Sequence, residues 1–190
     1  MNRLWKKWAW LILLLVGISF VARGVWLKGK PILAAVLLRA AWEKTVTAGQ
    51  PVKAWPWADT WPVARLRVDR LAIDLIVLEG DSGEVLAFGP GHVAGSGSPT
   101  GLGNCVLVGH RDTSFQFLQN LRLGDKIVVE GQGKRSRTYL VQSTAIVPAQ
   151  ELYLQDTNDA WLTLITCYPF ASLGSASDKR YVIFAGLAGG

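Results

Sequence analysis

The segment TLITCYPF, residues 163–170, ends a run of strand-forming residues with a cysteine. Side chains alternate between the two faces of a β-strand, so Cys167 shares a face with Thr163 and Ile165 at the end of the predicted strand. A free cysteine usually behaves as a small buried hydrophobic residue, whereas a thiolate at an accessible strand end can act as a nucleophile. The segment alone leaves open whether Cys167 fills the core, forms a disulfide, binds a metal or attacks a substrate.

Two further residues could complete a nucleophilic site. Arg180 begins the predicted strand 180–187, and antiparallel pairing with the strand of Cys167 would bring its guanidinium near the sulfur. A permanent cation there would favour the thiolate and could donate to an oxyanion. His110 ends the predicted strand CVLVGH and could protonate a leaving amine. Each residue could instead be structural. Cys167 could fill the core, His110 could be a hydrogen-bonded structural histidine, and Arg180 could form a surface ion pair with a residue such as Asp178.

The second cysteine is expected to be structural. Cys105 begins the strand that His110 ends, about five residues and about 16 Å away. That distance excludes a disulfide with a cysteine beside His110, because bridged Cα atoms stay within about 7 Å. Zinc would need about four ligands of the Cys/His type. The two cysteines and two histidines of the chain show no CxxC or HxxxH spacing, so no structural zinc site is expected.

The remaining histidine, His92, and the triplet that contains His110 do not point to further catalytic sites. His92 lies in the glycine-rich segment GPGHVAGSG, where tight turns are expected, and a structural or cleft-wall role is favoured over catalysis. The triplet His110-Arg111-Asp112 matches the HRD motif of protein kinases. No glycine-rich kinase loop, DFG or APE motif accompanies it, so we interpret the match as chance.

Short β-rich segments separated by turns would position these residues. From Val63 onward, apolar residues alternate in at least six segments, with glycine-rich breaks between them. This pattern predicts an all-β domain built as one closed or nearly closed barrel. The one segment with a helical pattern is 114–121. The predicted strands lie within residues 64–79, 104–109, 125–131, 138–147, 161–167 and 180–187.

The N-terminal region carries a candidate membrane anchor. Residues 8–22 are fifteen residues without a charge, or about 22 Å of helix against a hydrocarbon core of about 30 Å. Continuation to Leu27, snorkelling basic residues and tryptophans near both ends could complete a span. A cleaved signal peptide is the alternative, but small residues at a cleavage point are not evident around 21–23. We expect an uncleaved signal anchor over 1–27, whose flanking charges leave the orientation open.

Charge is distributed unevenly along the chain. The net charge of +6 divides into +7 for residues 1–62 and −1 for residues 63–190. A basic protein can bind nucleic acid, but the excess here belongs to the membrane-proximal region. No nucleic-acid partner is therefore expected.

Residues 28–62 should connect the anchor to the barrel. Residues 31–44 begin with a proline at a plausible first helical position, contain good helix formers and are too short to span a membrane. We expect a helix that lies on the membrane or docks on the domain. Residues 47–62, TAGQPVKAWPWADTWP, contain three prolines, which favour an extended linker. Its Trp-Pro repeats could pack on the barrel or reach the membrane interface.

Three motifs in this order resemble the signature regions of the sortases, cysteine transpeptidases that cut a C-terminal sorting signal and join the protein to an amine. They are VGHRD at 108–112, TLITCYPF at 163–170 and DKRYVIFA at 178–185. The resemblance extends over about residues 63–188. The linker PWADTWPVARL is similar to the class GN sortases of Gram-negative proteobacteria.

The resemblance implies a closed eight-stranded barrel over 63–190 with one or two short helices. It implies Cys167 as nucleophile, His110 as general acid and base, and Arg180 as stabiliser of the oxyanion or substrate. The substrate-discriminating loop of the family falls between residues 149 and 161. Expected substrate contacts are Thr166, Glu151, Leu152 and Tyr153.

The resemblance also implies a single-pass protein of the inner membrane whose domain faces the periplasm or the outside. Its expected partners are a protein with an LPxTG-like sorting signal and an amine acceptor, and we expect a monomer that needs no cofactor or metal. Two other functions are alternatives. An L,D-transpeptidase would show an SHGC-like motif, which the chain lacks. A non-catalytic, membrane-tethered barrel that binds an envelope protein is the alternative from a different class.

Overall fold

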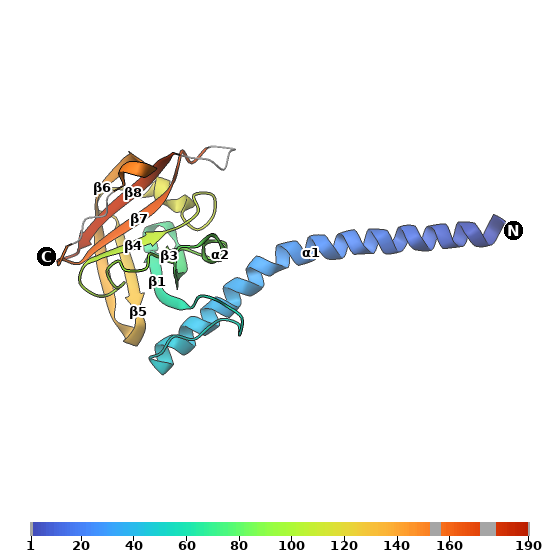
Figure 1. Ribbon diagram of the computed structural model, residues 1–190, viewed down its shortest axis with the longest axis horizontal. Helices are drawn as coiled ribbons and strands as arrows, with labels where there is room; N and C mark the ends of the chain where they lie inside the picture. The colour runs from blue at the N-terminus through green and yellow to red at the C-terminus, as the bar shows by residue number, and fades with distance from the viewer. Residues whose placement is uncertain (1, 153–156, 172–177, 190) are drawn as a thin grey trace. The chain divides into compact units, whose positions relative to one another are not determined.

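The computed structural model describes residues 2–152, 157–171 and 178–189 (Figure 1). The chain divides into two compact units, Met1–Val36 and Leu37–Gly190. The first unit is entirely helical among its described residues, and the second contains the barrel.

A single helix, α1, covers Asn2–Ala48 with Pro31 in its interior. The separate helix expected from residue 31 was therefore wrong, because the helix is already formed when it reaches the proline. An interior proline removes one i→i−4 hydrogen bond and crowds the preceding turn. The Leu- and Ala-rich residues that follow Pro31 favour helix strongly enough to continue it.

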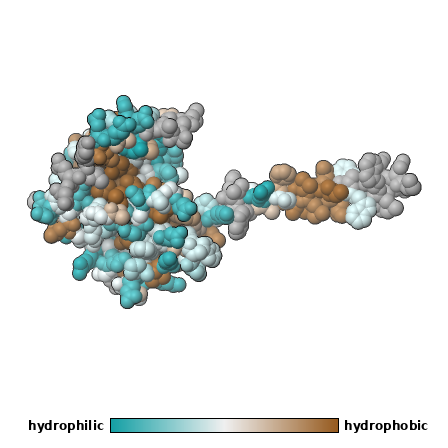
Figure 2. All heavy atoms as spheres, viewed as in Figure 1, coloured by the Kyte–Doolittle hydropathy of each residue, from teal (hydrophilic) through white to brown (hydrophobic). Residues whose placement is uncertain are grey.

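The N-terminal part of α1 is long and apolar enough to cross a membrane, judged by length and composition. Its side chains from Trp10 to Val21 are exposed on all faces of the helix, and they form the hydrophobic band along the helix in Figure 2. A helix that is apolar all round is unfavourable in water and favourable in lipid. This segment is consistent with a signal anchor or a signal sequence.

Eight strands form a closed barrel in the order β1-β2-β3-β4-β7-β8-β6-β5 (Figure 1). The β2–β3 and β4–β7 pairs are parallel, and the other pairs are antiparallel. The strands are β1 (Pro62–Val68), β2 (Ile73–Glu79), β3 (Gly91–His92), β4 (Asn104–Val108), β5 (Lys126–Gly131), β6 (Ser136–Pro148), β7 (Trp161–Tyr168) and β8 (Lys179–Leu187). The closed eight-stranded barrel is confirmed.

Helical turns in this unit are short. The α-helix α2 covers Gly83–Leu86. The 3₁₀ turns are η1 (Asp69–Leu71), η2 (Gln116–Asn120), η3 (Gln132–Lys134) and η4 (Ala149–Glu151). The helix expected over 114–121 is therefore the shorter 3₁₀ turn η2.

One strand shows no alternation of apolar and polar residues in the sequence. β3 is only two residues long and lies in the glycine-rich segment, where no alternation is visible. Gly91 is required there because a Cβ at this position would overlap the carbonyl oxygen of Gly80. This close approach lets β3 pair in parallel with the end of β2 and join it to β4.

The barrel interior is filled by large apolar side chains from alternating strand positions. Leu162, Leu164 and Ile183 lie in this core and have no exposed surface. Their strands β7 and β8 are therefore clamped in register by the core, with Leu164 directly opposite Ile183. This register determines what lies at the ends of the two strands.

The last turns of α1 dock on the barrel. Leu38 and Trp42 are buried, and Leu38 packs against Leu78 and Val85. The hydroxyl of Thr45 accepts a hydrogen bond from the N–H of Val52 at 3.0 Å, which turns the chain after the helix. The docking alternative expected for this segment is thus seen for its C-terminal part.

Truncating a core residue of β7 should destabilise the barrel much more than truncating a surface leucine. We expect Leu164→Ala to lower the free energy of unfolding by about 2–5 kcal/mol, because it removes buried contacts and leaves a cavity. Leu123→Ala is the matched control, since Leu123 is 69% exposed; its effect should stay within about 0.5 kcal/mol. Urea unfolding of the full chain in detergent measures both, and equal effects would contradict this core assignment.

Candidate active site

Cys167 and Arg180 are directly opposite each other in the antiparallel β7–β8 pair. Directly opposite residues project to the same face, with Cβ atoms about 4.5–5.5 Å apart. Two positions earlier on β7 and two later on β8, Ile165 and Val182 pack together in an apolar cluster separate from the barrel core. Cys167 and Arg180 therefore share the outer face of the barrel. The sequence-based prediction of this pairing is confirmed.

His110 reaches the same place from the neighbouring strand. β4 runs parallel to β7 with Val108 beside Ile165, and the Gly109 N–H continues the ladder by donating to the Ile165 carbonyl at 3.2 Å. Two residues further along are His110, in the segment that follows β4, and Cys167 on β7. The side chain of His110 is exposed. Three adjacent strands thus bring a thiol, an imidazole and a guanidinium to one end of the barrel.

The local geometry before His110 depends on Thr166. Its buried hydroxyl donates to the carbonyl oxygen of Gly109 at 2.7 Å, so the side chain points away from the face of Cys167. Gly109 leaves no room for a Cβ, which would lie 2.8 Å from the ring of Phe115. Thr166 was expected to contact substrate; the structure gives it a contact with the His110 segment, and the substrate contact stays a prediction.

Arg111 provides a second link between the two segments. Its side chain is only 5% exposed, and its Nη1 donates to the carbonyl oxygen of Pro169 at 3.0 Å. Its Nε lies 3.4 Å from the exposed carboxylate of Asp112. Sequence reasoning missed this residue, because the HRD triplet was considered only as a kinase motif. A buried arginine directly after His110 thus holds the turn directly after Cys167.

The two cysteines differ in environment. Both are free thiols, but Cys105 has no exposed surface whereas Cys167 is half-buried. Burial raises the pKa of the Cys105 thiol to about 12, so its thiolate population near neutral pH is negligible. Cys105 is a core residue, as expected, and Cys167 is the cysteine that a reagent can reach.

An apolar surface adjoins the site on the outer face. Leu152, Val108 and Phe184 pack against the buried cluster of Ile165 and Val182, and Figure 2 shows hydrophobic side chains at the surface over this side of the barrel. Of the other expected substrate residues, Glu151 is exposed at the end of η4. Tyr153 lies outside the described residues.

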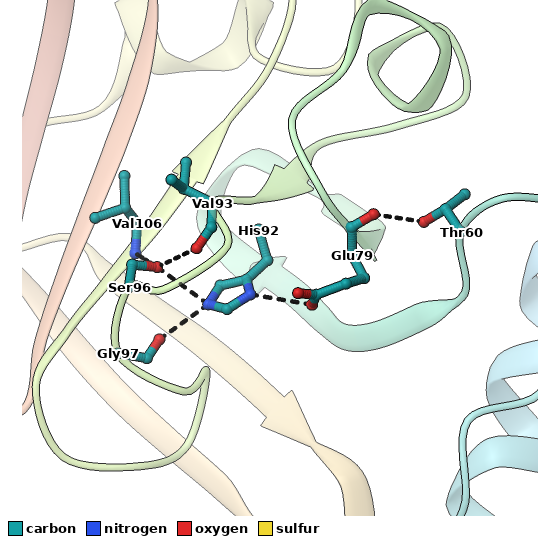
Figure 3. A network of polar contacts seen from close by, with 7 residues as sticks. All are labelled: Thr60, Glu79, His92, Val93, Ser96, Gly97 and Val106. Atoms are coloured by element: carbon teal, nitrogen blue, oxygen red, sulfur yellow. Dashed lines mark hydrogen bonds and ion pairs between the residues drawn. The ribbon is translucent and has the colours of Figure 1, made fainter.

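His92 belongs to a separate polar network (Figure 3). Its Nδ1 lies 3.1 Å from Oε2 of Glu79, and its Nε2 lies 3.1 Å from Oγ of Ser96. This spacing resembles a Ser–His–Glu triad. The Ser96 hydroxyl, however, donates to the Val93 carbonyl at 2.7 Å and accepts from the Val106 N–H at 3.2 Å. With His92 only 7% exposed, the network joins β2, β3 and β4 structurally, in agreement with the role expected for His92.

Metal-ligating side chains do not cluster in the described part of the chain. No group of three or more His, Cys, Asp or Glu side chains lies close enough together there to hold an ion.

The fold and the site together define a barrel protein with a half-buried thiol, a guanidinium and an imidazole at the same end of three adjacent strands. A family model described as Sortase domain matches residues 66–188. The chain belongs to the sortase family, a family of cysteine transpeptidases.

Known relatives support the same assignment. Sortase D of Bacillus subtilis is 35% identical over 123 residues, which cover 63% of this chain and 60% of that protein. The structure of a Clostridium perfringens Sortase D5 transpeptidase superposes with a TM-score of 0.62 over 77% of this chain and 88% of that one, at 20% identity, and shows the shared fold. Sortase A from Corynebacterium diphtheriae gives a TM-score of 0.60 at 26% identity, over 69% and 62% of the two chains.

The subgroup expected from the linker finds no support in these comparisons. These relatives bear the names Sortase A and Sortase D, and the class GN grouping is not supported. The motifs around His110, Cys167 and Arg180 fall inside the matched range, whereas the PWADTWP segment lies before it. The assignment to the sortase family therefore depends on the barrel residues and not on the linker.

The two cysteines should differ in their rates of alkylation. We expect iodoacetamide at pH 7–8 to modify Cys167 in the folded protein and to leave Cys105 unmodified until the protein unfolds. The reason is that Cys105 is buried and its pKa of about 12 leaves almost no thiolate. Mass spectrometry of the digested protein measures each rate, with Cys167→Ala as the control that loses the fast reaction. Equal rates for both thiols would contradict the site.

Proposed function

We propose that this protein is a membrane-anchored cysteine transpeptidase that cleaves an LPxTG-like C-terminal sorting signal through a thioester and transfers the protein to an amine. The observation that carries the proposal is the register of three strands. Cys167 of β7 is directly opposite Arg180 of β8, and the segment that bears His110 follows β4, the other neighbour of β7. Family membership supports the reaction class.

The first step would form an acyl-enzyme. The thiolate of Cys167 attacks the carbonyl carbon of the scissile peptide bond and forms a C–S bond. A guanidinium on the same face, that of Arg180, stabilises the oxyanion of the tetrahedral intermediate. The imidazolium of His110 then donates its proton to the leaving nitrogen, and the C–N bond breaks to give a thioester and a free amine.

The second step would return the enzyme to its starting state. An incoming amine attacks the thioester carbon while neutral His110 accepts a proton from the nitrogen. The new amide forms as the C–S bond breaks, and the thiolate of Cys167 is released. Water in place of the amine would give hydrolysis. Cys167 and His110 each have to carry the correct protons, so the pH–rate profile should be bell-shaped.

The sorting signal would bind on the outer face beside Cys167. The apolar surface formed by Leu152, Val108 and Phe184 offers hydrophobic contacts to an extended peptide. Glu151 and Tyr153 are proposed as further contacts from the same loop region. We propose that α1 anchors the protein as a single span of the cytoplasmic membrane, with the domain facing the periplasm or the outside, because its substrate is an exported protein.

The central experiment is a transfer assay. The full chain in detergent is incubated with an LPxTG-type peptide and an amine, and products are separated by mass spectrometry. Cys167→Ala should abolish transfer. Arg180→Ala should lower kcat/KM by about 10²–10³ through loss of oxyanion stabilisation, and His110→Ala by about 10²–10⁴ through loss of proton transfer. Cys105→Ala is the matched control and should retain activity. Undiminished cleavage by Cys167→Ala, or no cleavage by the wild type, would favour the non-catalytic binding module.

A second assay tests the link made by Arg111. Arg111→Met should lower kcat by about 10²-fold with little change in KM, because a shift of about 1 Å between His110 and Cys167 misaligns the reacting groups. Arg111→Lys should recover part of the loss, since a lysine can still donate to the Pro169 carbonyl. Circular dichroism controls for folding. A normal kcat in folded Arg111→Met would contradict the positioning role.

A further inference from the structure

The tryptophan- and proline-rich segment before the barrel is folded, and it forms one wall of a groove. The groove has a volume of about 410 Å³. One wall comes from residues 55–60 and the other from the loop and helix that follow β2. We call it the aromatic groove, and its lining residues are Trp55, Trp57, Ala58, Asp59, Thr60, Ser82, Glu84, Val85, Ala87 and Phe88.

Several contacts hold the first wall in place. The ring of Trp55 packs edge-on against Phe88, with centroids 5.1 Å apart, and Trp55 also contacts the buried cluster that includes Val85. The hydroxyl of Thr60 donates to the Glu79 carbonyl at 2.6 Å (Figure 3). The groove is therefore preformed, so a ligand would not have to order it on binding.

Two aromatic side chains of the groove remain exposed to solvent. Trp57 is 80% exposed and Phe88 is 47% exposed. Each leaves apolar area in water, and large exposed aromatic groups that line a groove are typical of binding surfaces. Trp55 packs against the buried cluster that includes Val85, whereas the ring of Trp57 stays largely in water. The exposed ring of Trp57 is therefore available to a ligand.

The negative charge of the groove favours a ligand that carries a positive charge. Asp59 and Glu84 both line it and both are exposed. Neither residues 54–61 nor residues 80–91 contain a lysine or an arginine, although the chain as a whole carries a net charge of +6. An ammonium or guanidinium group could contact these carboxylates and the face of an aromatic ring at the same time.

We propose that the aromatic groove binds an extended peptide segment of a partner protein that carries a lysine or arginine next to an apolar side chain. The apolar side chain packs against the paired rings of Trp55 and Phe88, and the cation lies against Trp57 with Asp59 and Glu84 beside it. An anionic lipid surface fits less well, because it would repel both carboxylates.

The groove is distinct from the site of Cys167. It is formed by the segments before β1 and after β2, whereas Cys167 lies on β7, and β3 and β4 separate β2 from β7 around the barrel. Binding there is therefore a second interaction, and it does not depend on peptide cleavage.

Fluorescence anisotropy with labelled peptides tests the proposal on the full chain in detergent. The probe is acetyl-Leu-Lys-Leu-Arg-amide, and the comparison peptide replaces both basic residues with glutamate. We expect saturable binding of the basic peptide only, weakened about tenfold by Trp57→Ala and by the double variant Asp59→Asn, Glu84→Gln. Leu123→Ala and Asp159→Asn are matched controls, since both residues are exposed elsewhere, and they should bind normally.

Three results would overturn the proposal. The first is equal binding of the basic and acidic peptides, and the second is binding unchanged by Trp57→Ala. The third is contact of the groove with lipid. To test lipid contact, Trp57→Cys is labelled with a polarity-sensitive dye in a Cys105→Ala, Cys167→Ala chain and reconstituted into phosphatidylcholine vesicles. We expect brominated lipids to leave the dye unquenched, and quenching would show a membrane-facing surface instead. Neither measurement depends on peptide cleavage, so their failure is separate from failure of the transpeptidase proposal.

Discussion

The antiparallel register of β7 and β8 is the constraint on which the candidate site depends. A slip of one residue would move Cys167 or Arg180 to the opposite face. The barrel core prevents such a slip, because Leu164 and Ile183 are opposite each other and fully buried. Hydrophobic packing in the interior thus determines chemistry at the surface. The segment bearing His110 is held to the same end by hydrogen bonds to the Gly109 and Pro169 carbonyls.

Much of this arrangement could be predicted from local patterns. Period-2 alternation identified the strands of the barrel, and a strand that ends in Cys167 followed by one that begins at Arg180 implied their pairing. The position of His110 required non-local information, since the parallel β4–β7 pair joins strands more than fifty residues apart. The resemblance of three motifs to the sortases supplied what periodicity could not.

Other features could not be predicted from local patterns of apolar residues. β3 consists of two residues in a glycine-rich segment, and its pairing depends on backbone approach and not on side-chain pattern. α1 continues through Pro31 because the segments before and after the proline both form helix. Arg111 looks like a surface residue in the sequence and is buried only because the turn after Cys167 covers it. The linker prolines suggested an extended tether, but Trp55 packs into the barrel surface and shapes the aromatic groove.

Trapping the acyl-enzyme tests the central claim most directly. The protein is mixed with an LPxTG-type peptide without an amine, quenched in acid and measured by intact mass spectrometry. We expect an added mass equal to the N-terminal peptide fragment, located on Cys167 after digestion and released by hydroxylamine as a thioester requires. We expect no adduct on Cys167→Ala. An adduct on any other residue, or turnover of the peptide by Cys167→Ala, would contradict the account.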